Sequence, residues 1–433
     1  MITNKEIDFA AYNQSFEFVE LGFAGKLLVK LLRTFKINTI AYKLDFFERM
    51  LNFLKIVGLE ALSNNLQTDI FTNGKIKLSS LNKADNMSQS FVEFLFQFEI
   101  LTLENEVFEI KPEYEELLKD GVIKKVIQVE DISFIQTLSK PIQALISDYL
   151  FVRDLVNKYN KPTHQLQFVK QNTSKWEALI NEKQLDYEVR LCETLYNLVY
   201  LQIPNKIKSP FSEDYYTESG QNAFKNFTRF IFPNYLKKIK PQENLQVLDL
   251  GCGYGNYIDV VQKTYPKASI DGIEINPKVH AVTKAKFADN DRVAILNQDF
   301  FDFETAKKYD AILVNYVFFY FNSEEKQRLI EKAKQLLTAD GSIIICQYFS
   351  GIEAMKAQLA QKQKDNSLAK KIEMYYSDKV LYTNTLWNDA VDTFSEAAKW
   401  NEFKRIASTA GLQITSMTNA DKFYYSLFIE LKR

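Results

Sequence analysis

Residues 247–255 read Val-Leu-Asp-Leu-Gly-Cys-Gly-Tyr-Gly, and the predicted fold follows from this stretch. Its first four residues are apolar apart from Asp249 and predict a buried strand. The glycines at 251, 253 and 255 predict a sharp turn after that strand. Glycine lets the backbone turn tightly and lets a ligand approach where a Cβ atom would collide. Ligands of open α/β sheets bind at the carboxyl ends of strands. We therefore expect a ligand-binding loop at this position.

Around this stretch, apolar β-rich runs alternate with amphipathic helical segments from about residue 215 onward. This alternation predicts an α/β fold with a doubly wound, mostly parallel, Rossmann-like sheet that helices cover on both faces. After a helix over 400–410, two more runs at 412–419 and 423–433 predict an antiparallel hairpin at the C-terminal edge of the sheet. The earlier runs cover 246–251, 269–275, 293–299, 310–318 and 341–349.

Polar side chains near the ends of these runs suggest what the loop binds. Glu274, at the end of the second run, can accept hydrogen bonds from both hydroxyls of a ribose. Asp299 can bind an adenine amino group, and the ring of Phe300 can cover an adenine face. The loop is GxGxG rather than GxGxxG, lacks Lys and Arg, and is preceded by Asp249. These three features argue against a ligand that contains a pyrophosphate. Adenine, ribose, a sulfonium and an ammonium fit better, so we expect S-adenosyl-L-methionine as the cofactor.

These motifs resemble the class I S-adenosylmethionine-dependent methyltransferases over residues 245–350. The resemblance implies that the first motif holds the methionyl part, that Glu274 holds the ribose, and that Asp299 with Phe300 holds the adenine. In similar enzymes an aromatic residue ahead of the first strand closes over the cofactor. The residues expected to contact the cofactor are Asp249, Gly251, Cys252, Gly253, Gly255, Glu274, Asp299, Phe300, Asn315 and Tyr216. For Cys252 we expect a space-filling role rather than a reactive thiol.

The chain before residue 205 has a mostly helical pattern. Apolar residues at helical spacing over 27–66 are interrupted at Asn38 and Gly58. A helix over 86–99, followed by short strands at 101–103 and 107–110, gives the order of elements typical of a winged helix. We expect three parts: a mainly α-helical, winged-helix-like domain over 1–121, a helical insert or linker over 122–205, and the cofactor-binding domain over 206–433.

This arrangement is similar to the small-molecule O-methyltransferases of plant and bacterial secondary metabolism. The resemblance implies a homodimer whose N-terminal part covers a pocket for a small-molecule acceptor. The insert is longer than is usual in this family. Three roles for it remain possible: a lid, an extension of the interface, and a docking surface for a carrier protein.

The sequence departs from this family where a His-Asp pair usually supplies a general base. Phe319 and Tyr320 stand at that pair, and neither His164 nor His280 lies at a matching position. We therefore expect O-methylation of an acidic hydroxyl or a carboxylate by positioning alone. Tyr320 or Tyr316 is the alternative proton acceptor.

The acceptor is expected to be aromatic or otherwise apolar, since the predicted pocket includes several large side chains. The expected pocket residues are Phe319, Tyr348, Met374 and Trp387. Transfer to carbon or nitrogen, or non-methylating use of the cofactor, remains a second interpretation. A ligand-sensing DNA-binding regulator is a remote third interpretation. The helix over 86–99 carries no Lys or Arg, and phosphate contact needs cationic side chains.

Composition limits the remaining classes. The 433 residues carry 54 Lys and Arg against 55 Asp and Glu, which argues against bare nucleic acid or a membrane surface as the main partner. No apolar run approaches the ~18 residues that span a bilayer. With 2 His and 3 Cys, no zinc-ligand spacing occurs, so no metal is expected. We expect a cytoplasmic protein.

Overall fold

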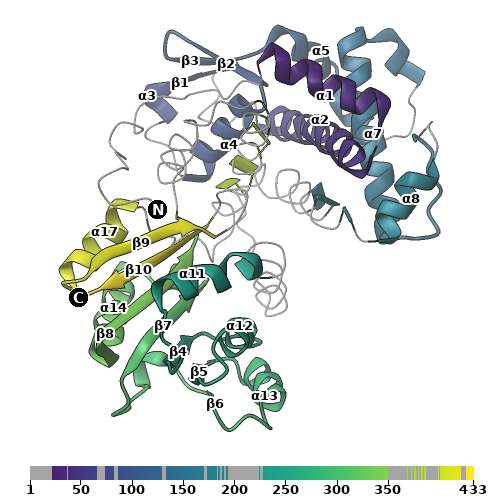
Figure 1. Ribbon diagram of the computed structural model, residues 1–433. Coiled ribbons are helices and arrows are strands. Elements are labelled where there is room, and N and C mark those ends of the chain that lie inside the picture. Colours follow the sequence, from purple (N-terminus) through teal and green to yellow (C-terminus); the bar gives the residue numbers. More distant parts are fainter. Residues whose placement is uncertain are drawn as a thin grey trace. The chain divides into compact units, whose positions relative to one another are not determined.

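The computed structural model divides the described part of the chain into two compact units (Figure 1). Unit 1 contains the described residues of 224–349 and 398–433, and unit 2 contains those of 22–193 and 368–386. The described helices of the 122–205 segment thus belong to the same unit as the helices before them. The described residues are 22–36, 38–65, 74–81, 86–128, 133–169, 173–193 with gaps, 224, 228–349, nine positions over 368–386, 398, 400–420 and 426–433.

Unit 1 is built on a seven-stranded sheet with the order β6-β5-β4-β7-β8-β10-β9. The five strands from β6 to β8 are parallel, and β10 pairs antiparallel with both β8 and β9. The predicted mostly parallel sheet and its antiparallel C-terminal hairpin are therefore confirmed. The strands are β4 (Gln246–Leu250), β5 (Ser269–Ile273), β6 (Val293–Leu296), β7 (Tyr309–Asn315), β8 (Leu337–Gln347), β9 (Gln413–Asn419) and β10 (Leu427–Lys432).

Helices cover both faces of this sheet because alternate side chains of each strand point to opposite faces. Val247 and Leu313 pack in the apolar layer under α11 and α12, whereas Leu248 and Ile312 pack in the layer under α14 and α17. The carboxyl ends of β4, β5, β6 and β7 consequently meet at one edge of a sheet buried on both faces. The helices of unit 1 are α11 (Phe232–Ile239), α12 (Asn256–Thr264), α13 (Pro277–Lys286), α14 (Ser323–Leu336) and α17 (Trp400–Thr409).

Unit 2 is mainly helical, and its longest helix corrects one expectation. α2 runs through Gly58 without a break, whereas the predicted interruption near Asn38 does separate α1 from α2. A Cβ at Gly58 would lie 2.9 Å from the ring of Phe94, so this glycine serves close packing of α2 against α4. None of the described helices is both long and apolar enough to cross a membrane. The helices are α1 (Phe23–Phe35), α2 (Thr39–Asn65), α3 (Leu78–Leu81), α4 (Asn86–Gln97), α5 (Glu115–Leu118), α6 (Val122–Gln128), α7 (Lys140–Asn160) and α8 (Thr173–Asn181).

A small antiparallel sheet has the strand order β1-β3-β2, in which β1 precedes α3 and α4 and the other two strands follow α4. Its strands are β1 (Lys75–Lys77), β2 (Leu101–Glu104) and β3 (Val107–Ile110). The hairpin between β2 and β3 turns at Asn105 and Glu106, both with positive φ, as a two-residue hairpin turn requires. The expected helix, strand, turn and strand are present, and β1 is an addition that the sequence pattern did not indicate.

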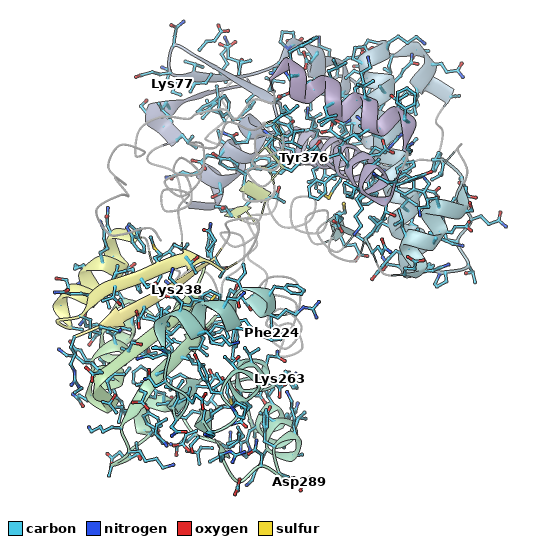
Figure 2. All side chains as sticks on the ribbon, viewed as in Figure 1. Lys77, Phe224, Lys238, Lys263, Asp289 and Tyr376 are labelled. Carbon is cyan, nitrogen blue, oxygen red and sulfur yellow. The ribbon has the colours of Figure 1, made fainter. Side chains whose placement is uncertain are left out.

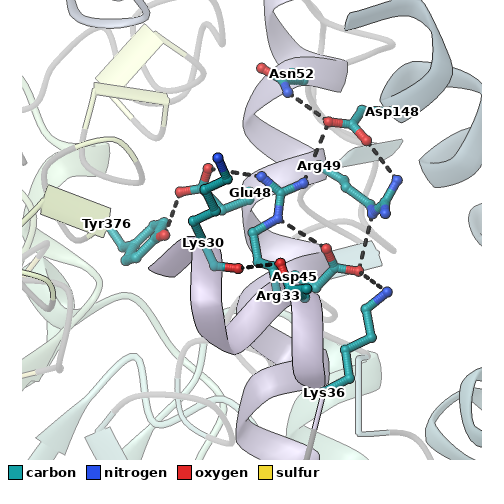
Figure 3. Close-up of polar contacts among 10 residues, drawn as sticks. Lys30, Arg33, Lys36, Asp45, Glu48, Arg49, Asn52, Asp148 and Tyr376 are labelled. Carbon is teal, nitrogen blue, oxygen red and sulfur yellow. Dashed lines mark hydrogen bonds and ion pairs between the residues drawn. The ribbon is translucent and has the colours of Figure 1, made fainter. Parts of the chain in front are cut away.

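An ion network joins α1, α2 and α7 of unit 2 (Figure 3). Asp45, which is 1% exposed, lies 3.0 Å from Arg33 Nε, 3.1 Å from Arg49 Nε and 3.2 Å from Lys36 Nζ. Arg49 Nη1 also lies 2.6 Å from Asp148 on α7. One buried carboxylate therefore faces three cations, and its charge offsets their mutual repulsion.

Candidate functional site

The loop after β4 follows the shape that its glycines predict. Gly251, Gly253 and Gly255 all have positive φ, and Gly255 caps the N-terminus of α12. A Cβ at Gly255 would lie 2.4 Å from Phe287, so packing excludes any side chain there. A Cβ at Gly253 would meet nothing within 4 Å. Gly253 thus presents bare backbone to open space, where a ligand can approach closely.

Asp249 is the buried carboxylate of the site. Its side chain is 1% exposed, and its Oδ2 atom has no hydrogen-bond partner among the described residues. Burial, with a smaller contribution from the charge of Glu274, raises the pKa of Asp249 to about 8. A buried carboxyl without a partner costs free energy unless a ligand supplies one. The group thus fits a cationic ligand such as the ammonium of S-adenosylmethionine.

Glu274 connects the loop to the end of β5. Its Oε2 accepts a hydrogen bond from Gly253 N at 3.0 Å, and its Oε1 accepts one from Asn276 N at 2.8 Å. A carboxylate offers about four acceptor positions, so two remain for a ligand. This geometry fits the two hydroxyls of a ribose.

The residues after β6 have local roles in the structure. Asp299 Oδ1 accepts a hydrogen bond from Phe301 N at 2.8 Å, and the ring of Phe300 is buried in the core. Asn297 Nδ2 donates to Glu274 O at 2.8 Å, which joins the ends of β5 and β6. The adenine-binding roles of Asp299 and Phe300 remain predictions.

Asn315 and Tyr316 lie at the end of β7. Both amide atoms of the Asn315 side chain are buried without a hydrogen-bond partner among the described residues. Asp249 pairs in register with Leu313, two residues before Asn315, so Asp249 and Asn315 project from the same face of the sheet. Tyr316 has a φ of 55°, which is strained for a bulky residue. Its N–H donates to Cys346 O at 2.7 Å and its hydroxyl donates to Ser426 Oγ at 2.9 Å, so both ends are held.

The other expected residues are placed only in part. Tyr320 is 39% exposed, whereas Phe319 and Tyr348 are buried. The rings of Phe319 and Tyr320 lie 4.7 Å apart in η7 (Phe318–Tyr320). Three expected residues lie outside the described residues: Tyr216, Met374 and Trp387.

Neither histidine lies at the end of β7. His164 Nε2 lies 2.8 Å from Asp154 in unit 2, and His280 Nε2 lies 3.3 Å from the carbonyl of Ile295. Burial raises the pKa of the Cys252 thiol, which supports a space-filling role. No His, Cys, Asp and Glu group suited to a metal occurs among the residues that the structure describes.

Two polar residues of this region were not predicted. Thr283 Oγ1 donates to Gly253 O at 2.6 Å and so holds the loop from α13. Gln347, the last residue of β8, is fully buried, and both of its amide atoms lack partners within the described chain. A single Gln in the apolar run 341–349 was the signal for the second residue. Thr283 gave no signal because the contact joins distant parts of the chain.

Comparison with known proteins agrees with this geometry. Residues 247–341 match the family model described as a methyltransferase domain. This part of the chain is a methyltransferase domain. The match confirms S-adenosyl-L-methionine as the expected cofactor of the domain. It covers the glycine loop, Glu274, Asp299 and the end of β7, whereas Gln347 lies beyond the matched stretch.

Similar proteins extend over limited parts of the chain. Malonyl-(acyl-carrier protein) O-methyltransferase of Priestia megaterium is 28% identical over 109 residues, which is 25% of this chain and 39% of that protein. The chain thus spans well under half of that relative. An uncharacterized methyltransferase of Oceanobacillus iheyensis is 28% identical over 153 residues, 34% of this chain and 70% of the relative. A solved O-methyltransferase family 2 protein from Planctomyces limnophilus, in complex with apigenin, aligns at 14% identity with a TM-score of 0.46, over 89% of this chain and 95% of that one.

Two of the three loop glycines, Gly253 and Gly255, permit a matched test. Ala at Gly253 has room for its Cβ, so we expect it to lower the free energy of unfolding by only ~1 kcal/mol, while the added methyl weakens cofactor binding at least about tenfold. Ala at Gly255 collides with Phe287, so we expect a loss of about 2–3 kcal/mol. Urea unfolding and calorimetric titration with S-adenosylmethionine measure the two quantities. Unchanged cofactor affinity in Gly253→Ala would show that the ligand does not approach this backbone.

Proposed function

We propose that the chain transfers a methyl group from S-adenosylmethionine to a small acceptor, releasing S-adenosylhomocysteine. The buried Oδ2 atom of Asp249, without a partner among the described residues, carries this proposal. It lies at the end of a central strand, directly before a glycine loop whose Gly253 faces open space. The partnerless oxygen of Asp249 favours a cationic group that can pair with it, and Glu274 would repel an anionic cofactor.

The residues of the site would hold the cofactor at separate points. Asp249 would face its ammonium, and Glu274 would bind the ribose with the two acceptor positions that backbone N–H groups leave open. The bound cofactor supplies an electrophilic methyl group on a sulfonium. The protein's task is then to exclude water and to align an acceptor atom with that methyl.

For the acceptor we propose an acidic hydroxyl or a carboxylate on an aromatic or apolar small molecule, as in secondary metabolism. Carboxylates are ionised at neutral pH and acidic phenols lose their proton close to it, so no general base is required. Asn315 and Tyr316 would border the acceptor, because they lie at the carboxyl end of β7, where Asn315 projects from the same face of the sheet as Asp249. The hydrogen bond from Tyr316 to Ser426 fixes this hydroxyl as a donor, which suits positioning better than proton abstraction.

Tyr320 is the exposed hydroxyl that tests this assignment. Because positioning rather than proton transfer is proposed, Tyr320→Phe is expected to keep kcat within about threefold of the wild-type value. The measurement is the rate of S-adenosylhomocysteine release with a saturating acceptor. A loss above ~100-fold would identify the Tyr320 hydroxyl as the base.

For unit 2 we propose a winged-helix arrangement of α3, α4 and the small sheet, which serves homodimerisation and covers the acceptor. The order of elements supports the winged helix. A carrier protein is a proposed partner, since one similar protein is named as acting on malonyl-(acyl-carrier protein). The acidic side chains of β3 and of the turn before it would repel DNA phosphates, which argues against DNA as the partner of this sheet.

The acceptor class can be tested with deuterated S-adenosylmethionine and matched acceptors. Benzoates and acidic phenols, free and as carrier-protein thioesters with a free carboxylate, are compared with the corresponding anilines and indoles. We expect the deuterated methyl on oxygen. Transfer to nitrogen or carbon alone would overturn the acceptor assignment and leave the cofactor assignment intact. Failure of the wild-type chain to bind S-adenosylmethionine would overturn both.

A further inference from the structure

A cavity of about 450 Å³ lies entirely within unit 2, in the mainly helical part of the chain. It lies between α1, α2, the end of α4 and two residues from the segment 368–386. Its size is in the range of small-molecule sites. The described residues that form the cofactor site all belong to unit 1, so this cavity is not part of that site.

The charges around the cavity are unequal. Its cations are Lys26, Lys30, Arg33, Lys55 and Lys379, and its acids are Glu48 and Glu99. Figure 3 shows Arg33 and Glu48 side by side, and their closest atoms are 3.6 Å apart. Glu48 also accepts a hydrogen bond from Tyr376, which is labelled in Figure 2. Both acids are therefore engaged, since Glu99 lies 3.8 Å from Lys55 Nζ.

Two of the lysines have no carboxylate partner among the described residues. Lys26 and Lys30 stand one turn apart on α1, and neither ammonium group has an acid within ion-pair distance among the described residues. Between like charges on one helix face there is repulsion rather than stabilisation. An anion in the cavity would relieve that repulsion.

Deeper in the cavity the cations lie beside apolar surface. Lys55 is 16% exposed, and Lys379 is 2% exposed with its ammonium 5.1 Å from the ring of Tyr375. Val29, Leu51 and Phe98 complete the wall, and each is at most 5% exposed. Burial lowers the pKa of Lys55, and the nearby charge of Glu99 opposes this shift.

We propose that this cavity binds a small organic anion, with a phosphate or carboxylate facing the lysines and an apolar or aromatic part against Val29, Leu51 and Phe98. Five cations and two acids line the cavity, and because Arg33 also pairs with Asp45 and Asp148, the excess positive charge lies mainly on the lysines. The apolar wall gives the remainder of such a ligand a surface to bury.

The test uses phenyl phosphate, benzoate and benzyl alcohol as matched probes, titrated calorimetrically into the full chain with saturating S-adenosylhomocysteine. We expect at least one anion to bind at least about tenfold more tightly than benzyl alcohol, and its affinity to fall with added salt. The better of the two anions identifies the headgroup. No anion binding, or equal binding of the alcohol, would overturn the proposal.

Variants locate the site. Lys55→Met keeps the length of the side chain and removes the charge, so we expect unchanged or higher thermal stability together with anion affinity about tenfold weaker. The double variant Lys26→Gln/Lys30→Gln removes exposed charges and cannot disturb the core. Lys125→Gln, an exposed lysine of α6 outside the cavity, is the control and keeps wild-type affinity. Wild-type affinity in both cavity variants would show that the anion binds elsewhere.

Discussion

Asp249→Asn is expected to weaken S-adenosylmethionine binding at least about 100-fold while leaving the domain folded. The change removes a charge-assisted hydrogen bond from a fully buried position, and an amide of the same shape cannot attract the ammonium. The fold should tolerate Asn because burial already favours the uncharged carboxylic acid. Asp259→Asn in α12 is the matched control, since that carboxylate is 34% exposed and pairs only with Lys286 among the described residues.

The titration of Asp249 gives the same variant a second readout. Its pKa is raised to about 8, so near neutral pH the unliganded site holds a proton that an ammonium would displace. Binding should therefore release this proton, and affinity should rise about twentyfold between about pH 6 and about pH 7.5. Calorimetry in buffers of different ionisation enthalpy measures the release. Asp249→Asn should show none.

The same raised pKa fixes the sign of a stability effect. The folded chain holds the proton of Asp249 more tightly than the unfolded chain does. Its contribution to the free energy of unfolding is therefore complete below about pH 4 and is lost as pH rises through about 8.

If S-adenosylmethionine binds Asp249→Asn and the wild type alike, the carboxylate has no role in cofactor recognition.

Asp45→Asn is expected to lower the free energy of unfolding of unit 2 by about 3 kcal/mol. The carboxylate is 1% exposed and faces Arg33, Lys36 and Arg49 (Figure 3). Without it, three cations remain close together, and among the described residues Asp148 and Glu48 offset part of their charge. The three cations are themselves partly exposed, at 27%, 10% and 17%, which places the effect at the lower end for a broken buried ion pair.

Urea unfolding measures this loss, and hydrogen exchange of peptides from α2 assigns it to unit 2. Glu109→Gln is the control, because its pair with Lys75 is exposed on both sides and is worth ~0–1 kcal/mol. An Asp45→Asn loss no larger than that of the control would mean that water screens the network. The proposed anion site would be unaffected by that outcome, because Asp45 does not line the cavity.

Local patterns in the sequence predicted most of unit 1. The strands and the turn at Gly253 follow from hydrophobic runs and glycine spacing, which neighbouring residues determine. The same patterns failed where distant contacts decide. Gly58 indicated a helix break but serves close approach of Phe94, and the three-residue β1 is too short for any pattern. The basic cavity was not predicted either, since Lys30, Lys55 and Lys379 meet only in the folded chain.

The membership of residues 368–386 in unit 2 also bears on how the protein is made and dissected. These residues follow β8 in the chain, yet Tyr376 donates to Glu48 and Lys379 donates to the carbonyl of Gln97. During synthesis, unit 2 therefore cannot be completed until the five strands from β4 to β8 of unit 1 have been made. A single cut near residue 206 would separate this segment from the helices of unit 2 that it contacts. Separating the units requires a second cut, or a short loop that bridges the end of β8 to α17.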